Sequence, residues 1–308
     1  MIEIKNKTRL KRKSSLTSIF TASLFIFVIL LMAGTASAAT YTVDDDDSSA
    51  DYSTIQDAID DANDGDTILV SPGTYEEIAK NRDAYGSTSQ PYDFGLYINK
   101  DNLTIKGVDD NGNPITDYNN TEAEIISQGH TGFGTNGPFI AGNNVTISGL
   151  EITPNPDFSP NKNVEIAGNG VKLINNNING KIGSVYFNTG DVQNFSVTGN
   201  YINASLSFND GVGNETDMSN RIVKNNNVGI ISLAGEDTDV AWRNNAVGSV
   251  TIEDNIIRGH QYVLTYTDND EEKTYVYNGV FSRLGTITDP MDWDMIRESN
   301  TFKRGVYI

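Results

Sequence analysis

Four consecutive carboxylates form the densest cluster of candidate metal ligands in this 308-residue sequence. They are Asp44, Asp45, Asp46 and Asp47. Calcium prefers oxygen ligands and binds several carboxylates at once. The spacing is not that of an EF-hand loop, so a solvated acidic turn is the alternative interpretation. Calcium is the one cofactor that the sequence suggests, and no motif requires a cofactor.

Four tyrosines near the C-terminal end are candidates for carbohydrate binding: Tyr262, Tyr266, Tyr275 and Tyr277. Exposed aromatic rings on a rigid face can stack on sugar rings. Tyr275 and Tyr277 alternate, so they lie on one face if the segment is a strand. We expect residues 262–278 to form a hairpin that leaves the main pattern. Packing into a core is the alternative role for these rings.

Carboxylates on one face could also cleave a glycosidic bond, since glycoside hydrolases use two of them. The candidates are Asp191, Asp210, Asp237, Asp239 and Asp254. A solvated acidic face is the simpler interpretation, because the chain has 41 acidic residues. His130 and His260 are the two histidines, and neither stands in a motif that indicates a general base.

The composition excludes several classes of function. There are 41 acidic and 22 basic residues, which give a formal net charge of −19, and there is no cysteine. An acidic chain repels phosphate, so nucleic acid is excluded as a partner. The lack of cysteine excludes disulfides, thiol nucleophiles and cysteine-ligated metals.

Residues 1–39 have the order of a secretory signal peptide. A basic segment with Lys5 and Lys13 precedes an apolar stretch over 19–33, and small residues at 36–39 resemble a cleavage site. We therefore expect a secreted, extracellular protein at the cell surface. The alternative is an uncleaved N-terminal anchor, which would be the only membrane contact. Candidate glycosylation sites in N-x-S/T sequons are Asn102, Asn119, Asn144, Asn194, Asn203 and Asn214.

One helix is predicted at about 53–64, near the start of a single domain over 40–308. Ser53 and Gln56 form a capping-box pattern, and an apolar face follows at helical spacing. The segment Thr67–Val70 is predicted to be a strand, and residues 80–96 to be a long loop.

A short pattern then recurs, in which alternating apolar residues are followed by Gly or Asn, another Asn and a further apolar residue. The last apolar residues lie at 152, 178, 202, 228 and 247, and a further echo ends at 257. A repeat of about 20–26 residues that contains short strands is typical of one coil of a solenoid. Matching asparagines could stack as a ladder: Asn176, Asn200, Asn226, Asn245 and Asn255. A β-sandwich is the alternative, but it would not show this repeat.

The segment 52–77, followed by these asparagine-rich repeats, resembles the pectin-lyase-like superfamily of right-handed parallel β-helix proteins. The combination with an exported acidic chain is most similar to archaeal cell-surface β-helix proteins, of methanogens especially. The resemblance implies an all-β fold, a right-handed parallel β-helix with an N-terminal capping helix.

The resemblance is less specific for activity. Residues 73–77, Gly-Thr-Tyr-Glu-Glu, are similar to a G-x-Y-x-E motif of pectin methylesterases, but the segments that carry the catalytic residues of those enzymes have no match. Pectate lyases use calcium held by aspartates and an arginine base. Arg243 and Arg258 with Asp237, Asp239 and Asp254 are candidates without a linking motif.

We therefore expect a non-enzymatic surface protein that forms part of an extracellular layer or binds glycans. Its partners would be glycans, other surface-layer proteins, or a second copy stacked on a solenoid end. The alternative is a calcium-assisted polysaccharide lyase or a glycoside hydrolase that acts on acidic polysaccharide.

Overall fold

The structure is a computed structural model that describes residues 37–78, 80–82, 92–127, 137–154, 164–180, 182–184, 194–207, 216–217, 220–232, 246–247, 250–259, 262–268, 271–277, 280–281 and 293–303. Residues Ala38–Ile308 form one compact unit. The predicted signal segment lies almost entirely outside the described residues. No helix in the described part is long and apolar enough to cross a membrane.

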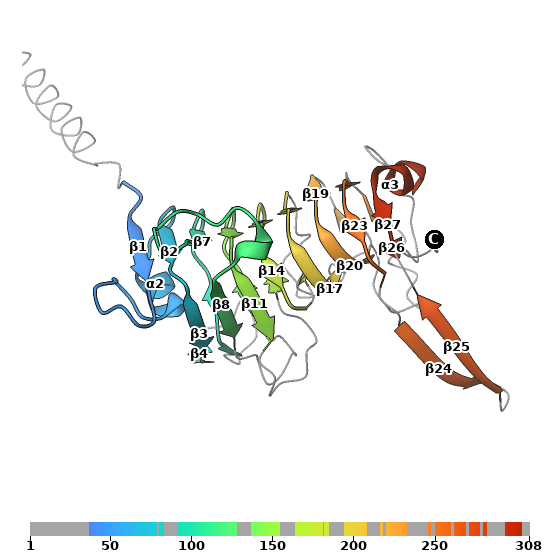
Figure 1. The fold of residues 1–308 in the computed structure, drawn as a ribbon, viewed down its shortest axis with the longest axis horizontal. Coiled ribbons are helices and arrows are strands. Elements are labelled where there is room, and N and C mark those ends of the chain that lie inside the picture. The colour runs from blue at the N-terminus through green and yellow to red at the C-terminus, as the bar shows by residue number, and fades with distance from the viewer. Residues whose placement is uncertain are drawn as a thin grey trace, which may run out of the picture. The chain divides into compact units, whose positions relative to one another are not determined.

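Short parallel strands wind into coils and form three faces (Figure 1). Face A is an eight-stranded sheet of β1 (Thr40–Val43), β2 (Thr67–Val70), β7 (Thr104–Gly107), β10 (Thr146–Ser148), β13 (Lys172–Ile174), β16 (Ser196–Thr198), β19 (Arg221–Lys224) and β22 (Val250–Glu253). Face B contains β3 (Gly73–Glu77), β8 (Ala123–Ser127), β11 (Glu151–Pro154), β14 (Asn177–Ile178), β17 (Tyr201–Ser207), β20 (Asn227–Ser232), β23 (Ile256–Ile257) and β27 (Thr301–Phe302).

Face C contains β6 (Tyr97–Ile98), β9 (Phe139–Ile140), β12 (Val164–Ile166) and β15 (Ile182–Ser184), continues through the second halves of β17 and β20, and ends at β26 (Val280–Phe281). Because β17 and β20 bend across both faces, B and C belong to one 13-stranded sheet. This architecture confirms the predicted all-β, right-handed parallel β-helix with an N-terminal capping helix.

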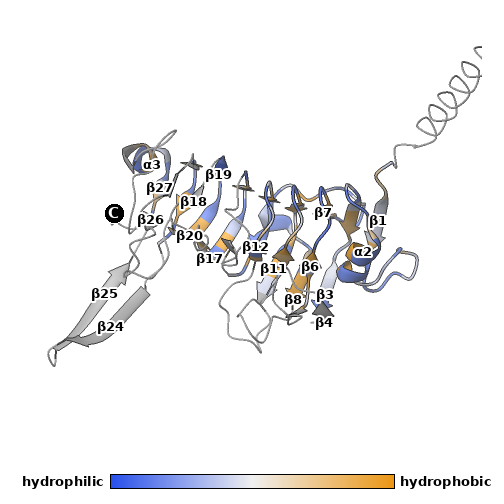
Figure 2. Ribbon diagram, turned by 180° about the vertical axis from the view of Figure 1, so that it is seen from behind, coloured by the Kyte–Doolittle hydropathy of each residue, from blue (hydrophilic) through white to orange (hydrophobic). Residues whose placement is uncertain are grey.

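Alternation of apolar and polar residues builds the core, since successive side chains of a strand point to opposite sides. On face A the inward positions stack in register from coil to coil: Ile68, Ile105, Ile147, Leu173, Val197, Val223 and Ile252. All of them are buried. The hydrophobic strands β6, β8 and β11 are visible in Figure 2.

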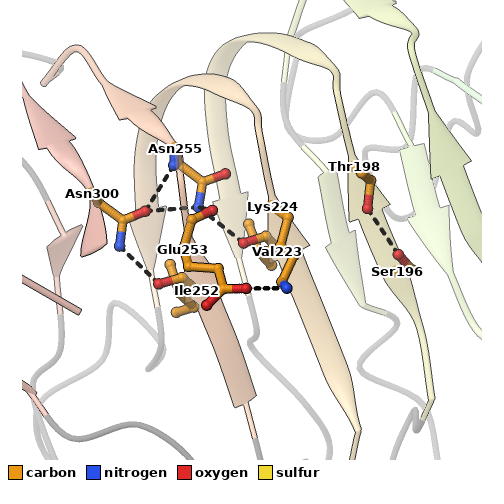
Figure 3. Close-up of polar contacts among 8 residues, drawn as sticks. All are labelled: Ser196, Thr198, Val223, Lys224, Ile252, Glu253, Asn255 and Asn300. Atoms are coloured by element: carbon orange, nitrogen blue, oxygen red, sulfur yellow. Dashed lines mark hydrogen bonds and ion pairs between the residues drawn. The ribbon is translucent and has the colours of Figure 1, made fainter. Parts of the chain in front are cut away.

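The corner between faces A and B holds a buried asparagine ladder. Each side-chain Nδ2 donates to the Oδ1 of the next coil at 2.8–3.0 Å, through Asn176, Asn200, Asn226, Asn255 and Asn300. The same Nδ2 atoms donate to backbone carbonyls of face A, as Asn255 does to Val223 (Figure 3). A buried polar group needs such partners, so the ladder satisfies this corner. The prediction missed Asn300, which lies 45 residues after Asn255.

The sequence repeat that ended at Val247 is not a coil. The strand β21 (Ala246–Val247) pairs with β18 (Thr216–Asp217) outside the three faces. Val228 instead pairs with Ile257, so this coil spans 29 residues. The irregular spacing in the sequence therefore reflects an inserted pair of strands. Asn245 lies outside the described residues.

Two helices lie at the ends of the described solenoid. Helix α2 (Ile55–Asp61) is shorter than the predicted 53–64, and Thr54, not Ser53, is its N-cap. The carboxylate of Glu77 accepts the backbone N–H groups of Ile55 and Gln56, which replaces the predicted capping box. At the other end, α3 (Trp293–Ser299) buries Ile296 in the core beside β22. The short strand Thr301–Phe302 follows this helix and pairs with β23.

Two hairpins leave the solenoid. Strands β4 (Lys80–Arg82) and β5 (Tyr92–Phe94) pair antiparallel inside the predicted loop. Strands β24 (Tyr262–Asp268) and β25 (Glu271–Tyr277) pair antiparallel, which confirms the predicted hairpin.

Candidate functional site

Face B carries its polar side chains in one row that runs along the solenoid. Register pairs the outward residues of successive strands in the order Thr74, Glu124, Glu151, Asn177, Tyr201, Asn227, Ile256 and Thr301. Parallel neighbours in a sheet lie about 4.8 Å apart. Side chains that are far apart in sequence therefore meet on this face.

Glu124 and Glu151 are direct neighbours in this row. Both are partly buried. Burial raises the pKa of Glu151, and repulsion by the Glu124 charge adds to the increase, while a hydrogen bond from Asn179 acts in the opposite direction. A carboxyl group with a raised pKa beside a second carboxylate is the arrangement that separates an acid from a base.

The side-chain amide of Asn179 holds Glu151 in place on the side of β14. The Nδ2 of Asn179 donates to Glu151 Oε1 at 2.8 Å and to Thr153 Oγ1 at 3.2 Å. This leaves the second oxygen of Glu151 available to carry a proton. Next in the row, Asn177 has a buried Oδ1 with no hydrogen-bond partner in the described part of the chain. A buried acceptor without a donor is costly.

Two tyrosines lie farther along face B. Tyr201 is two strands from Glu151, through Asn177. Its ring centroid is 5.9 Å from that of Tyr118. Tyr118 belongs to the short 3-10 helix η1 (Tyr118–Asn120) between β7 and β8, in the green segment that runs across the strands in Figure 1. The loop therefore reaches from an early coil to β17 and supplies a second ring to face B.

Arg258 approaches the same tyrosines from the C-terminal coils. Its guanidinium carbon lies 4.4 Å from the centroid of the Tyr201 ring. Its NH1 donates to the backbone and side-chain oxygens of Asn227, and its NH2 donates to the backbone oxygens of Ile202 at 2.7 Å and Asn203 at 3.0 Å. Burial lowers the pKa of Arg258, while Tyr201 and Tyr118 act in the opposite direction. The acceptors of these hydrogen bonds are all neutral.

The structure brings together three of the four predicted calcium ligands. Oxygen atoms of Asp44, Asp45 and Asp46 lie within 4.8 Å of one another. A hydrogen bond and repulsion from Asp44 raise the pKa of Asp46. Asp47 instead accepts hydrogen bonds from Ser49. Calcium binding at this turn stays a prediction.

The four predicted sugar-binding tyrosines lie in the two strands of the β24–β25 hairpin. Register pairs Tyr262 with Tyr277, Leu264 with Tyr275, and Tyr266 with Lys273. Their role in binding sugars stays a prediction.

Five of the predicted glycosylation asparagines are described, and all five are exposed: Asn102, Asn119, Asn144, Asn194 and Asn203. Asn102, Asn144 and Asn194 occupy a turn with positive φ before face A, where asparagine is favoured. Asn214 lies outside the described residues. Glycosylation stays a prediction.

The aspartates proposed as a catalytic group do not form one in the described residues. Asp254 is exposed at a turn with φ of 57° and is followed by Asn255 of the ladder. Asp191, Asp210, Asp237, Asp239 and Arg243 lie outside the described residues, as do His130 and His260. Sequence reasoning missed Glu124, Glu151 and Tyr118. Each glutamate directly precedes a buried isoleucine, and the two Glu-Ile pairs lie one coil apart. This spacing is the sequence signal that could have indicated that the two glutamates are neighbours.

Comparison with known proteins gives similarity at the level of the fold. No protein-family model and no curated protein matches the chain. A pectin methylesterase variant in complex with a hexasaccharide has 13% identity and a TM-score of 0.41, over 85% of this chain and 96% of that chain. The pectin methylesterase PemA from Erwinia chrysanthemi has 12% identity and a TM-score of 0.34, over 88% of this chain and 93% of that chain.

These comparisons correct the preferred prediction of function. The sequence favoured a non-enzymatic role in a surface layer or in glycan binding. The solved structures that match are enzymes, pectin methylesterases, so that prediction is wrong on this comparison. The alternative of an enzyme that acts on polysaccharide is carried forward.

Proposed function

We propose that the protein is a glycoside hydrolase and that face B, from β8 to β20, is its active site. The observation that carries the proposal is the pair of Glu124 and Glu151, which face the same side on neighbouring strands. A strand spacing of about 4.8 Å is close to the separation of about 5–5.5 Å between the two carboxyl groups of retaining glycoside hydrolases.

The two carboxyl groups have different roles. Glu151 is the acid, because burial and the Glu124 charge favour its protonated form. It gives its proton to the glycosidic oxygen as the bond to the anomeric carbon breaks. Glu124 is the nucleophile, which attacks the anomeric carbon and is released when water attacks in turn. Glu151, ionised after the first step, takes the proton from that water.

The neighbouring residues fit the binding of a sugar chain. Tyr201, two strands from Glu151, and Tyr118 beside it offer aromatic surface on the same face. Asn177 lies between Glu151 and Tyr201 in the same row. Stacking combined with a few placed polar groups is common in small-molecule sites.

The test is an assay of reducing-end release from a panel of neutral and acidic polysaccharides. Glu151→Gln keeps the shape and the hydrogen bond from Asn179 but cannot deliver a proton. We expect the rate to fall by about 10²- to 10⁴-fold. Glu76→Gln is the matched control, because Glu76 is exposed on the same face, in another row.

A rate for Glu151→Gln equal to that of the unchanged protein would contradict the proposal. So would the absence of hydrolysis on every polysaccharide in the panel. Export, an extracellular location and an archaeal origin are expected from the sequence and are separate from this test. A zymogram of a culture medium and its cells would place the activity outside or inside the cell.

A further inference from the structure

The compact part of the chain starts beside the predicted cleavage site of the signal segment. Two cuts fit the small residues at 36–39, one after Ala38 and one after Ala39. In the structure Ser37 and Ala38 are exposed, Ala39 is half-buried, and β1 begins at the next residue, Thr40. The two cuts differ in whether Ala39 stays with the folded chain, so the contacts of Ala39 distinguish them.

Ala39 is held at both its backbone N–H group and its carbonyl. The N–H of Ala39 donates to Oδ1 of Asp66 at 2.7 Å, and the carbonyl accepts the backbone N–H of Thr67 at 2.8 Å. The Oδ2 atom of Asp66 accepts the backbone N–H of Asn63, also at 2.8 Å. The contact between Ala39 and Asp66 is at the short end for an N–H donor, where hydrogen bonds to ionised groups are found.

No cation contacts the carboxylate of Asp66 among the described residues, although Asp66 is only 3% exposed. The hydrogen bond from Asn63 lowers its pKa, burial acts in the opposite direction, and the N–H of Ala39 lowers the pKa further. Lys100 acts on Asp66 through its charge, but its ammonium group donates to the backbone oxygen of Asp60. Buried charges are normally paired, so a positive charge on the nitrogen of Ala39 would complete this site.

We propose that the mature protein begins at Ala39 and that Asp66 binds the α-ammonium group of this residue. The peptidase that removes the signal segment hydrolyses the bond between Ala38 and Ala39. Water supplies a hydroxyl group to the carbonyl carbon of Ala38 and a hydrogen to the nitrogen of Ala39. The new carboxyl group of Ala38 then releases a proton, and the amine takes one up at neutral pH. This inference goes beyond the proposed function and does not depend on it.

The other cut, after Ala39, would remove this contact. Asp66 would lose the donor to its Oδ1, and the N–H of Thr67 would lose its acceptor. The cut after Ala38 keeps both hydrogen bonds and adds a charge, on a nitrogen that opens to solvent because Ala38 is exposed. Because β1 is the edge strand of face A (Figure 1), removal of the signal segment would strengthen the attachment of this edge to the solenoid.

The first test is the N-terminal residue of the exported protein. The full chain is produced in a bacterium that secretes it, and the first residue of the product is identified by Edman degradation. We expect this residue to be Ala39. A product that begins at Thr40 or at any other residue, or that keeps the signal segment, would overturn the inference.

The second test measures what the charge contributes to stability. A chain that begins at Ala39 is made by removing a fusion protein directly in front of this residue, and its control is the same chain with an acetylated N-terminus. Acetylation keeps the N–H donor and removes the charge. In urea unfolding at neutral pH, the unfolding equilibrium constant should be about tenfold smaller for the free amine, because the ammonium group adds a charge to the hydrogen bond with Asp66. A chain that begins at Thr40 should be the least stable of the three.

Two substitutions show whether Asp66 is the partner of the ammonium group. Asp66→Asn keeps the size of the side chain and removes its charge, so the free and acetylated chains should then be equally stable. Asp51→Asn is the matched control, because Asp51 also accepts a backbone N–H of β1, that of Thr42. The difference between the free and acetylated chains should remain in this control.

Equal stability of the free and acetylated chains in the unchanged sequence would overturn the inference, and this comparison requires no variant to fold. A difference that persists in Asp66→Asn would assign the effect of the charge to another group and would also overturn it. Loss of the difference in Asp51→Asn would show that the ammonium group acts on the whole acidic end and not on Asp66, which is a third contradicting result.

Discussion

Face A and face B are built from the same coils, but they place different chemistry on their outer sides. The outer positions of face A hold mainly hydroxyl and basic side chains: Thr67, Thr104, Thr146, Lys172, Ser196, Ile222 and Thr251. Its charged pair, Lys224 and Glu253, is partly exposed to solvent, and the hydroxyl groups of Ser196 and Thr198 share a hydrogen bond (Figure 3).

Face B instead places two carboxyl groups side by side, one with a raised pKa, and covers part of the strands with a loop. The backbone geometry of the two faces is alike, so the difference comes from the outward residue at each coil. Two faces of one regular solenoid can thus differ through the side chains that the register brings together and through a loop that contacts only one of the faces. The difference also shows where a change should affect activity and where it should not.

The largest expected effect is on activity, from removing the second carboxylate of face B. Glu124→Gln should lower the rate by about 10²- to 10⁴-fold. It should also lower the pKa of Glu151, since the Glu124 charge is one of the causes that raise it. Initial rates measured across pH check this. The residual activity of the variant should be lost at a lower pH than the activity of the unchanged protein. An unchanged rate would remove Glu124 from the mechanism.

The next effect is on stability, from the corner that joins the two faces. Asn226→Ala removes the acceptor for the backbone N–H and the Nδ2 of Asn200, and the donor to the carbonyl of Val197. Leaving these buried groups unsatisfied should lower the free energy of unfolding by about 3 kcal/mol. Urea unfolding measures it, with Asn99→Ala, at an exposed asparagine, as the control. Equal stability of the two variants would mean that the ladder contributes little.

A smaller effect is expected from the loop that covers face B. Tyr118→Ala removes the ring beside Tyr201 and leaves both carboxylates in place. We expect KM to rise by about three- to tenfold with little change in kcat, because an aromatic contact contributes about 0.5–1.5 kcal/mol. Steady-state kinetics on the best substrate checks this. A fall in kcat with constant KM would show that the loop acts on the reaction and not on binding.

The smallest effect is expected on face A. Lys224→Gln breaks the ion pair with Glu253, and such a pair on the surface contributes less than about 1 kcal/mol. Stability should change by that amount or less, and the hydrolytic rate should not change. A large loss of activity in this variant would mean that the two faces do not differ in function as described.

Much of the fold could be predicted from the sequence because coil geometry repeats. Apolar alternation and the asparagines at 176, 200, 226 and 255 indicated the stacked strands and the ladder. The last rung could not be found this way, since Asn300 follows a helix and not a strand of face A. The two-residue strand β21 resembled part of a coil in the sequence, although it pairs with β18. A segment of two residues is too short to show from its sequence which strand it pairs with.

The site was harder to predict for a physical reason. Core packing does not determine which residue type occupies an outward position of a solenoid. The sequence pattern therefore does not distinguish Glu151 from any other polar residue between two buried ones. Its environment depends on Glu124 from the previous coil and Asn179 from the next. The contact of Tyr118 with Tyr201 joins residues 83 positions apart through a loop, and no periodic pattern points to it.

The most direct test of the central claim is the titration of Glu151 itself, by carbon NMR of its side-chain carboxyl group, compared with the rate across pH. We predict that the pKa of Glu151 lies above its ordinary value of 4.5. The rate should fall as pH rises through this raised pKa. The raised pKa of Glu151 also makes stability depend on pH, because the folded protein holds this proton more tightly than the unfolded chain does. The free energy of unfolding therefore decreases as pH rises from the pKa of the unfolded chain to the pKa of the folded protein. Titration at or below 4.5, or a rate profile that does not change in Glu151→Gln, would contradict the account.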